Sequence, residues 1–442
     1  MLSLTPHTKE GFAHTGFRYQ LDAHLYQVRR LNEMAGACRW TWNHFLRFRE
    51  EAYLAARAAG GTLMPGAFSY VSNARELTRL RKLIPWLRDA DSVGLQQTLR
   101  DLDGAFARFF AGEAGYPQPR HYGDDRYRVC GKASFAVDGD WVRLPKLGWV
   151  RFRKSRDLPA GGRIMNVTVS REAAHWFVSF CVEHALSAAV APAGAPVGLD
   201  LGVTQSIAFS DDTEPFQMPV PDDTEAKFLR RLARQVSRKK QGSARRRKAV
   251  ERLARRKAYH ARRVRDAAHK LTTKLATTRS EIHVEDLRLR NMTASAAGTV
   301  VEPGKNVGQK AGLNRSLLAQ AHGQTVRLLA YKCERSGARL IFKNPAHTSQ
   351  ECAECHHIAP ENRPSQSVFR CVKCGHTDNA DHNAARVVLM RPAAGQAVAV
   401  RRGKRKTTRK GRSPDEARTH PRDRVAYPLG STGIPANAAK AA

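Results

Sequence analysis

The hydrophobic and polar positions of residues 195–210, APVGLDLGVTQSIAFS, follow the alternation of a half-buried β-strand that leads through a turn into a second strand. The apolar positions of this pattern are Val197, Leu199, Leu201 and Val203. Asp200 lies in the middle of the pattern, where Val or Ile is expected. Because an unpaired buried carboxylate is very costly, we expect Asp200 to be paired, hydrogen-bonded or bound to a metal.

The N-terminal part of the chain predicts a strand followed by helices. GFRYQLDA has the alternation of a strand, and residues 35–60 carry apolar residues at helical spacing up to a Gly pair that ends the helix. Residues 93–111 predict a second amphipathic helix. We expect Trp40 and Trp42 in a helix-bundle core, with stacking on nucleic-acid bases as the alternative.

Short alternating strands predict a β-rich region from about residue 128 to residue 184. The Asp138-Gly139 pair lies between two such strands and favours a hairpin turn. Several short strands joined by turns favour a small β-barrel or β-sandwich. The Ala- and Pro-rich residues 185–196 then predict a domain boundary.

The charge of the chain indicates a polyanionic partner. Lys and Arg outnumber Asp and Glu by 75 to 40, which gives a formal net charge of +35. Residues 227–270 alone hold 19 basic residues against two acids and predict two helices around a break at residues 241–243. Self-repulsion on this scale favours a nucleic-acid partner, whose binding falls steeply with salt. Residues 392–442, with eight basic residues among the twelve of 401–412, predict a basic disordered tail.

A membrane partner is not expected. We find no run of 18 or more apolar residues, and the first residues, MLSLTPHTKEGFAHTGF, lack the apolar core of a signal peptide. The expectation is a soluble cytoplasmic protein that associates with the nucleoid.

Two further acids repeat the unusual placement of Asp200. Glu285 ends the strand-like run IHVE, and Asp381 lies just before a short helix predicted over residues 384–389. Taken singly, Glu285 could start a helix and Asp381 could be an N-cap. If the three carboxylates converge, they repel one another unless divalent cations bind between them. Two Mg²⁺ ions would suit this set of ligands and would support phosphodiester cleavage.

Four of the eight cysteines have the spacing of a structural zinc site, with two C-x-x-C pairs separated by fifteen residues. These four are Cys352, Cys355, Cys371 and Cys374. A pair of disulfides is the alternative. His356, His357 and His376 lie beside the pairs but are not expected as ligands, because four thiolates complete the shell. We expect the remaining cysteines to be buried thiols, namely Cys38, Cys130, Cys181 and Cys333.

The order of these motifs resembles one known family. The motifs run GLDLGVTQSIAFS, the basic helices, IHVEDLRLRNM, NPAHTSQECAECHH and FRCVKCGHTDNADHNAARVVL, preceded by RWTWNHFL near residue 39 and LPKLGWVRFR near residue 144. This series, over roughly residues 30–391, closely resembles the TnpB family. Its members are RNA-guided nucleases encoded by bacterial and archaeal insertion sequences, and the presumed ancestors of the compact type V CRISPR effectors.

The resemblance implies a multidomain α/β protein. A split RNase H-like RuvC nuclease domain would hold a zinc-ribbon insertion, and an N-terminal β-barrel, the wedge, would be interrupted by a helical recognition domain. Asp200, Glu285 and Asp381 match the first, second and third catalytic acids. The implied domains are 1–23 and 116–190 (wedge), 24–115 (recognition), 191–345 and 379–391 (nuclease), 346–378 (zinc ribbon) and 392–442 (tail).

The resemblance also implies a function. The chain would be an RNA-guided DNA endonuclease that cleaves double-stranded DNA beside a short target-adjacent motif by metal-dependent hydrolysis. Its partners would be a guide RNA derived from the transposon end and the target DNA, with one copy of the protein in the RNA complex. A guided repressor that has lost cleavage, or a transposase or transposase accessory protein, is the alternative.

Two segments near the implied site carry further expectations. The family commonly has Gly where His356 follows the first cysteine pair, so a turn with positive φ is less easy here. Residues 293–312 predict a mobile loop, in the place of a lid in the family, that leads into one helix over residues 313–337.

Overall fold

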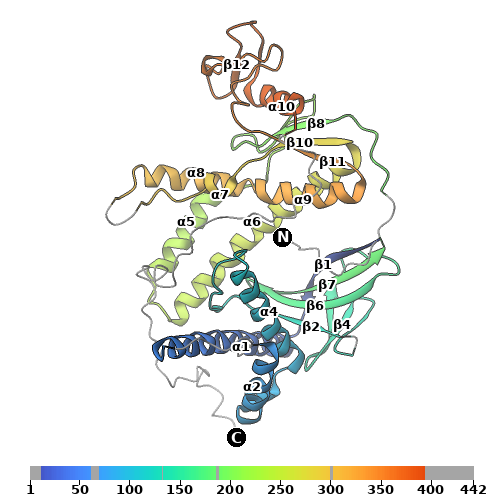
Figure 1. Ribbon diagram of the computed structural model, residues 1–442, viewed down its shortest axis with the longest axis vertical. Helices are drawn as coiled ribbons and strands as arrows, with labels where there is room; N and C mark the ends of the chain where they lie inside the picture. Colours follow the sequence, from blue (N-terminus) through green and yellow to red (C-terminus); the bar gives the residue numbers. More distant parts are fainter. Residues whose placement is uncertain (1–10, 61–68, 132, 186–188, 299–301, 394–442) are drawn as a thin grey trace. The chain divides into compact units, whose positions relative to one another are not determined.

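The structure is a computed structural model that describes residues 11–60, 69–131, 133–185, 189–298 and 302–393 (Figure 1). The basic tail expected over 392–442 lies outside these residues except for its first two positions. Across the described ranges, none of the helices has both the length and the apolar character that a membrane span needs.

The N-terminal sheet has seven antiparallel strands in the order β2-β6-β7-β1-β5-β4-β3. The strands are β1 (Phe12–Asp22), β2 (Arg126–Cys130), β3 (Ala136–Asp138), β4 (Trp141–Leu144), β5 (Gly148–Arg153), β6 (Arg163–Glu172) and β7 (His175–Ala185). The predicted Asp138-Gly139 turn joins β3 to β4, and Asp138 pairs with Trp141. In the described part of the chain no ladder joins the edge strands β2 and β3, so the strand order is open.

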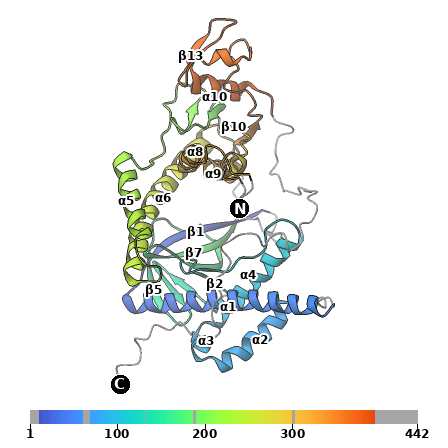
Figure 2. The same ribbon diagram turned by 90° about the vertical axis from the view of Figure 1, so that its left-hand side faces the viewer.

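Four helices are inserted between β1 and β2: α1 (Leu25–Ala58), α2 (Tyr70–Leu83), α3 (Pro85–Asp89) and α4 (Ser92–Phe110). They share one hydrophobic core with the sheet, and Figure 2 shows α1 as a single long helix beneath the strands. Trp42 is buried and donates its indole N–H to the carbonyl of Gln118 (2.9 Å), so it is a core residue. Trp40 is half-buried and stacks on His44 with ring centroids 4.6 Å apart.

A second sheet follows in the order β11-β10-β8-β9. Its strands are β8 (Val197–Asp200), β9 (Ala208–Phe209), β10 (Glu281–Glu285) and β11 (Arg339–Lys343). Strands β8, β10 and β11 are parallel, and β9 is antiparallel to β8. The predicted break at residues 241–243 is confirmed, since α5 (Asp223–Ser237) and α6 (Ala244–Thr278) lie on either side of it.

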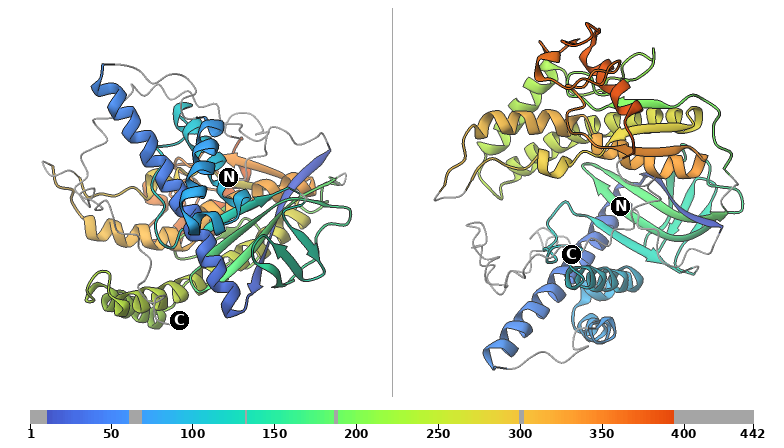
Figure 3. Two further views of the ribbon diagram at one scale, coloured as in Figure 1. Left: turned by 90° about the horizontal axis from the view of Figure 1, so that it is seen from below. Right: turned by 45° about the horizontal axis from the view of Figure 1, so that its top comes forward.

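The two faces of β8 pack against different helices. Val197 and Leu199 share a core with α6 and α9 (His322–Ser336). Gly198 points to the other face, where a Cβ atom would lie 2.2 Å from the carbonyl oxygen of Ala385 in α10 (Ala380–Met390). Only glycine permits this approach, and α9 and α10 accordingly lie on opposite sides of the sheet (Figures 1 and 3). The strand is therefore buried on both faces, which corrects the half-buried strand expected from the sequence.

The prediction of a single helix over residues 313–337 is wrong. The chain forms α8 (Val307–Ala319) and α9, after a short α7 (Leu289–Met292), and part of the predicted loop is thus helical. The break occurs at Ala321, which has a φ of 54°. There the side chain of Gln320 accepts a hydrogen bond from Ser206 Oγ (2.6 Å) and donates one to the carbonyl of Val203 (3.0 Å). At this break between α8 and α9, the side chain of Gln320 therefore fixes the turn between β8 and β9.

Candidate carboxylate and zinc sites

Asp200 and Glu285 are neighbours at one edge of the second sheet. They are the last residues of the parallel strands β8 and β10, in which Leu199 lies opposite Val284. Because side chains alternate along a strand and both Leu199 and Val284 pack toward α6 and α9, the two acids face α10.

Asp381 comes to the same edge from the helix. It lies in the first turn of α10 and not before the helix, which corrects the position expected from the sequence. The N-cap is Asn379, whose Oδ1 accepts hydrogen bonds from the amides of Asp381 (2.9 Å) and His382 (3.3 Å). The close passage of α10 over Gly198 brings this first turn toward Asp200, and a helix N-terminus favours a negative charge.

The acids are close enough to perturb one another. The pKa of Asp200 is raised to about 7. Burial is the largest cause, although part of the side chain reaches solvent, and the charges of Glu285 and Asp381 follow. Arg363 opposes this shift and lies 3.4 Å from Asp381 Oδ1. Burial also raises the pKa of Glu285, against the effect of a hydrogen bond from Thr348.

These carboxylates fit a divalent cation in chemistry, but they do not form a closed cage. Among the described residues, the four cysteines are the only group of three or more His, Cys, Asp or Glu whose ligand atoms all lie within 4.8 Å of one another. Mg²⁺ takes one or two carboxylates and completes its shell with water and substrate phosphates, so it suits an open arrangement. Three acidic side chains against the guanidinium groups of Arg363 and Arg391 still leave negative charge to neutralise.

The four cysteines are drawn together as the spacing predicts, and they fit a zinc ion. Their sulfur atoms lie 3.6 Å apart in the pair Cys352–Cys374 and 3.5 Å apart in the pair Cys355–Cys371, and none forms a disulfide. Burial raises the pKa of the Cys371 thiol, but hydrogen bonds from the backbone amides of Cys374 and Lys373 outweigh this effect and lower the pKa to about 6. This favours the thiolate form that binds metal.

The two cysteine pairs form matching turns. The amide of His356 donates to the carbonyl of Cys352, and the amide of Gly375 donates to that of Cys371, each at 3.0 Å. Both His356 (φ 57°) and Gly375 (φ 76°) adopt the left-handed conformation, so the strain expected at His356 is present. The ribbon around them consists of β12 (Val368–Arg370), β13 (Thr377–Asn379) and a short 3₁₀ helix (Pro360–Asn362).

The other four cysteines are only partly as expected. Cys38 and Cys333 are buried, but Cys130 and Cys181 are half-buried, which corrects that prediction. The latter two lie on β2 and β7 opposite Asn166 of the intervening strand β6, so they belong to the sheet and not to its core.

The basic helices use few of their charges internally. Arg256 in α6 forms hydrogen bonds with both oxygens of Glu225 (2.5 and 2.7 Å). By contrast Arg245, Arg247 and Lys248 are exposed, and no ion pair joins them to an acid within the described ranges. This end of α6 therefore presents charge that a polyanion can neutralise.

Comparison with known proteins places the chain in a family. A protein of Escherichia coli (strain K12) named "Putative RNA-guided DNA endonuclease InsQ" is 39% identical over 385 residues, which are 86% of this chain and 92% of that protein. The chain belongs to the TnpB family. A "Putative RNA-guided DNA endonuclease" of Streptomyces pristinaespiralis is 31% identical over 407 residues, 90% of this chain and 94% of the relative.

Family models match three parts of this TnpB-family chain. Residues 179–296 match a model described as a probable transposase, and residues 322–388 match a Cas12f1-like TNB domain. Residues 13–57 match a helix-turn-helix domain, although the structure there is β1 followed by one continuous helix, α1. A solved structure described as a Cas12f1–sgRNA–target DNA complex aligns with a TM-score of 0.48 at 12% identity over 83% of each chain, and this likeness supports no inference of its own.

Several residues around the carboxylates carried no signal in the sequence. Thr348 and Arg363 contact Glu285 and Asp381, and nothing in their spacing marks them. A small cavity of about 100 Å³ is lined by Glu285, Asp286 and mostly apolar residues, among them Leu201 and Leu289. Gly198 is the position in the sequence that indicates the packing of α10 on β8, since a glycine within a strand marks a close approach of backbone.

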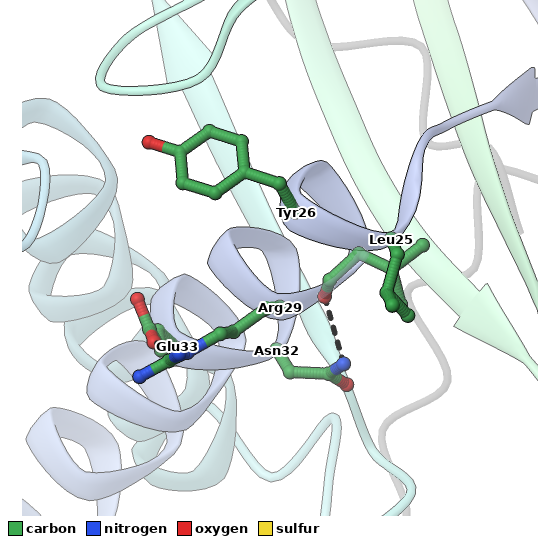
Figure 4. A pocket seen from close by; sticks show the side chains of 6 residues that line it. Leu25, Tyr26, Arg29, Asn32 and Glu33 are labelled. Atoms are coloured by element: carbon green, nitrogen blue, oxygen red, sulfur yellow. Dashed lines mark hydrogen bonds and ion pairs between the residues drawn. The ribbon is translucent and has the colours of Figure 1, made fainter. Parts of the chain in front are cut away.

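A larger open hollow of about 610 Å³ lies elsewhere, at the start of α1 (Figure 4). It is lined by Leu25, Tyr26, Val28, Arg29, Asn32 and Glu33. The only acid among these residues, Glu33, is paired with Arg29 at 3.1 Å. The hollow therefore lacks the convergent carboxylates that mark the edge of β8 and β10.

Proposed function

We propose that this TnpB-family protein is an RNA-guided DNA endonuclease that hydrolyses phosphodiester bonds with Asp200, Glu285 and Asp381 as metal ligands. The observation that carries the proposal is the convergence of these acids: Asp200 and Glu285 end adjacent parallel strands, and α10, which packs over Gly198, brings Asp381 to the same edge. The contribution of Glu285 and Asp381 to the raised pKa of Asp200 agrees with it. The names of the relatives that cover most of the chain support the guided DNA cleavage.

The chain's own residues would perform distinct parts of the reaction. Asp200 must lose its proton to act as a ligand, and because its pKa without a bound cation is about 7, cation binding would displace this proton. Thr348 holds one oxygen of Glu285, and Arg363 shares the charge of Asp381. Divalent cations bound here would activate a water molecule and stabilise the leaving oxygen. Arg363 would then be free to contact the phosphate backbone.

The domain assignment is part of the same proposal. The seven-stranded sheet would be the wedge, with α1–α4 as the recognition domain. The second sheet with α5–α10 would be the RuvC-like nuclease, and residues 346–378 the zinc ribbon. A guide RNA from the transposon end and the target DNA would neutralise the exposed charges of α6, which include Arg245 and Arg247.

The first experiment is to express the protein together with its native flanking DNA and to sequence the RNA that copurifies. A discrete RNA, structured at one end and variable at the other, is expected and supplies the target for a cleavage assay. Asp200→Ala should abolish cleavage and leave RNA and DNA binding intact. Asp286→Ala is the matched control, because this exposed acid follows Glu285 directly and lies outside the proposed ligand set.

A guided repressor without cleavage is the second candidate, and the same experiment separates it. Loss of the acids is the mark expected for such a protein, but all three stand in this chain. Binding to the target without cutting by the wild-type protein would establish the repressor, and a random mixture of RNA would contradict both guided functions.

A further inference from the structure

The zinc-ribbon segment, residues 346–378, reaches the carboxylate edge at three points. Thr348 Oγ1 donates a hydrogen bond to Glu285 Oε1 (2.5 Å). Arg363 lies 3.4 Å from Asp381, and the side chain of Gln366 donates to Thr204 Oγ1 (3.1 Å) in the turn after β8. The ribbon thus contacts the elements that carry all three acids.

The contact between Thr348 and Glu285 is the most buried of the three. Thr348 is 5% exposed and Glu285 is 7% exposed, so water cannot readily replace either partner. The hydroxyl has a single proton, and its bond to Glu285 is much shorter than its 3.3 Å approach to the carbonyl of Pro345. A charge-assisted hydrogen bond of this kind fixes one carboxylate oxygen and leaves the other for a ligand.

The turn that carries Thr348 is held from two sides. On one side Arg391, at the end of α10, binds Glu351 (2.7 Å) and the carbonyls of Asn344 (2.9 Å) and Ala346 (2.6 Å). On the other side the turn continues into Cys352, four residues after Thr348 and one of the four clustered cysteines.

Asn383 of α10 adds a second brace next to Cys352. Its Oδ1 accepts a hydrogen bond from the amide of Ala353 (3.0 Å), and its Nδ2 donates to the carbonyl of Glu351 (2.8 Å). Asn383 is completely buried. The helix that supplies Asp381 and the zinc-binding turn therefore hold Thr348 jointly.

From these contacts we propose that Thr348 is a positioning residue, which orients Glu285 for a divalent cation and links the zinc ribbon to the carboxylate site. The proposal rests on the proposed function, because it takes Glu285 to be a metal ligand. Residues that orient metal ligands typically change metal affinity by roughly 10- to 100-fold when they are replaced.

The test compares Thr348→Val, which keeps the shape and removes the hydroxyl, with Thr348→Ser, which keeps the hydroxyl. Thr41→Val is the matched control, because Thr41 is also a buried threonine and its hydroxyl binds only a backbone carbonyl, that of Ala37 (2.9 Å). Binding of Mn²⁺ to the full-length zinc-loaded protein is measured by the loss of the free-ion paramagnetic resonance signal. Zinc content and melting temperature of each variant are measured in parallel.

We expect Thr348→Val to keep its zinc and to bind Mn²⁺ roughly 10- to 100-fold more weakly, while Thr348→Ser and Thr41→Val bind as the wild type does. The Mg²⁺ concentration needed for half-maximal cleavage should rise in the same ratio. Equal Mn²⁺ affinity in Thr348→Val and wild type would overturn the inference alone. A wild-type protein that binds no Mn²⁺ outside its zinc site would instead overturn the proposed carboxylate site.

Discussion

The charge of Asp200 should make the stability of the magnesium-free protein depend on pH between about pH 4 and pH 7. Burial, together with the charges of Glu285 and Asp381, raises its pKa from 3.8 to about 7. Asp200→Asn keeps the shape of the side chain and removes the charge, so the difference between wild type and variant reports this group together with its coupling to Glu285 and Asp381.

The size of the effect follows from the two pKa values. Each unit corresponds to about 1.36 kcal/mol, so a shift from 3.8 to about 7 amounts to at most about 4 kcal/mol. Between these pH values the folded chain keeps the proton that the unfolded chain has lost. Stability therefore falls as the pH rises through this window and stays constant above it. About 3 of the 4 kcal/mol should be lost between about pH 5 and about pH 8.

The assay is urea denaturation followed by tryptophan fluorescence, in magnesium-free buffer without a chelator so that zinc stays bound. Relative to wild type, Asp200→Asn should gain about 3 kcal/mol between about pH 5 and about pH 8. Added Mg²⁺ should stabilise the wild type at the higher pH and leave the variant unchanged. Asp286→Asn, at an exposed acid, should follow the wild type. Parallel pH curves for wild type and Asp200→Asn would refute the raised pKa of Asp200, and with it the burial and the neighbouring charges that raise it.

Three other predictions concern the zinc, the core and the basic helix. Cys371→Ser should lose zinc, measured by mass spectrometry, and should open residues 346–378 to proteolysis, because the ribbon's core is little more than Phe369 and the cysteines themselves. Lys332→Met should destabilise the protein by about 1–3 kcal/mol in urea, because it removes the three hydrogen bonds that the ammonium donates, at 2.6–2.8 Å, to the carbonyl of His269 and the hydroxyls of Thr272 and Thr273. Replacing Arg245, Arg247 and Lys248 by Ser should reduce the slope of log affinity for RNA against log salt by at most about 3.

The sequence was sufficient to predict the elements whose pattern is local. The break at residues 241–243, the Asp138-Gly139 hairpin and the helix around residues 93–111 all occur, because turn chemistry and helical periodicity are set by neighbouring residues. The prediction of one helix over 313–337 was wrong because local periodicity does not show long-range contacts. The pattern is helical throughout, but Gln320 forms a hydrogen bond with Ser206 in a distant turn.

The site divides in the same manner. The four cysteines were predictable because zinc ligands in a ribbon obey fixed spacing. The sequence showed Asp200 inside an apolar strand pattern, Glu285 at the end of another and Asp381 before a helix. Glu285 does end β10, and Asp200 ends β8. Thr348 and Arg363 were not visible, because they contact acids 63 and 18 positions away, at a place that only the tertiary fold defines.

The zinc ribbon can support the carboxylate edge in two ways, and their magnitudes differ. The connection from β11 to α10 runs over residues 344–379, and zinc, which links Cys352 to Cys374, removes the 21 residues between them from its effective length of 36. This is slightly more than a halving, so the saving in closure entropy is about 0.8 kcal/mol.

One buried hydrogen bond to a charged group contributes about 1.5–3 kcal/mol, and Thr348 makes such a bond to Glu285. The specific contacts therefore outweigh the shortened loop. Loss of zinc should weaken metal binding at the acids only as far as it displaces Thr348. A zinc-free protein in which Thr348 still contacts Glu285 should keep most of its Mn²⁺ affinity, which makes hydrogen exchange of residues 346–353 the measurement to pair with zinc removal.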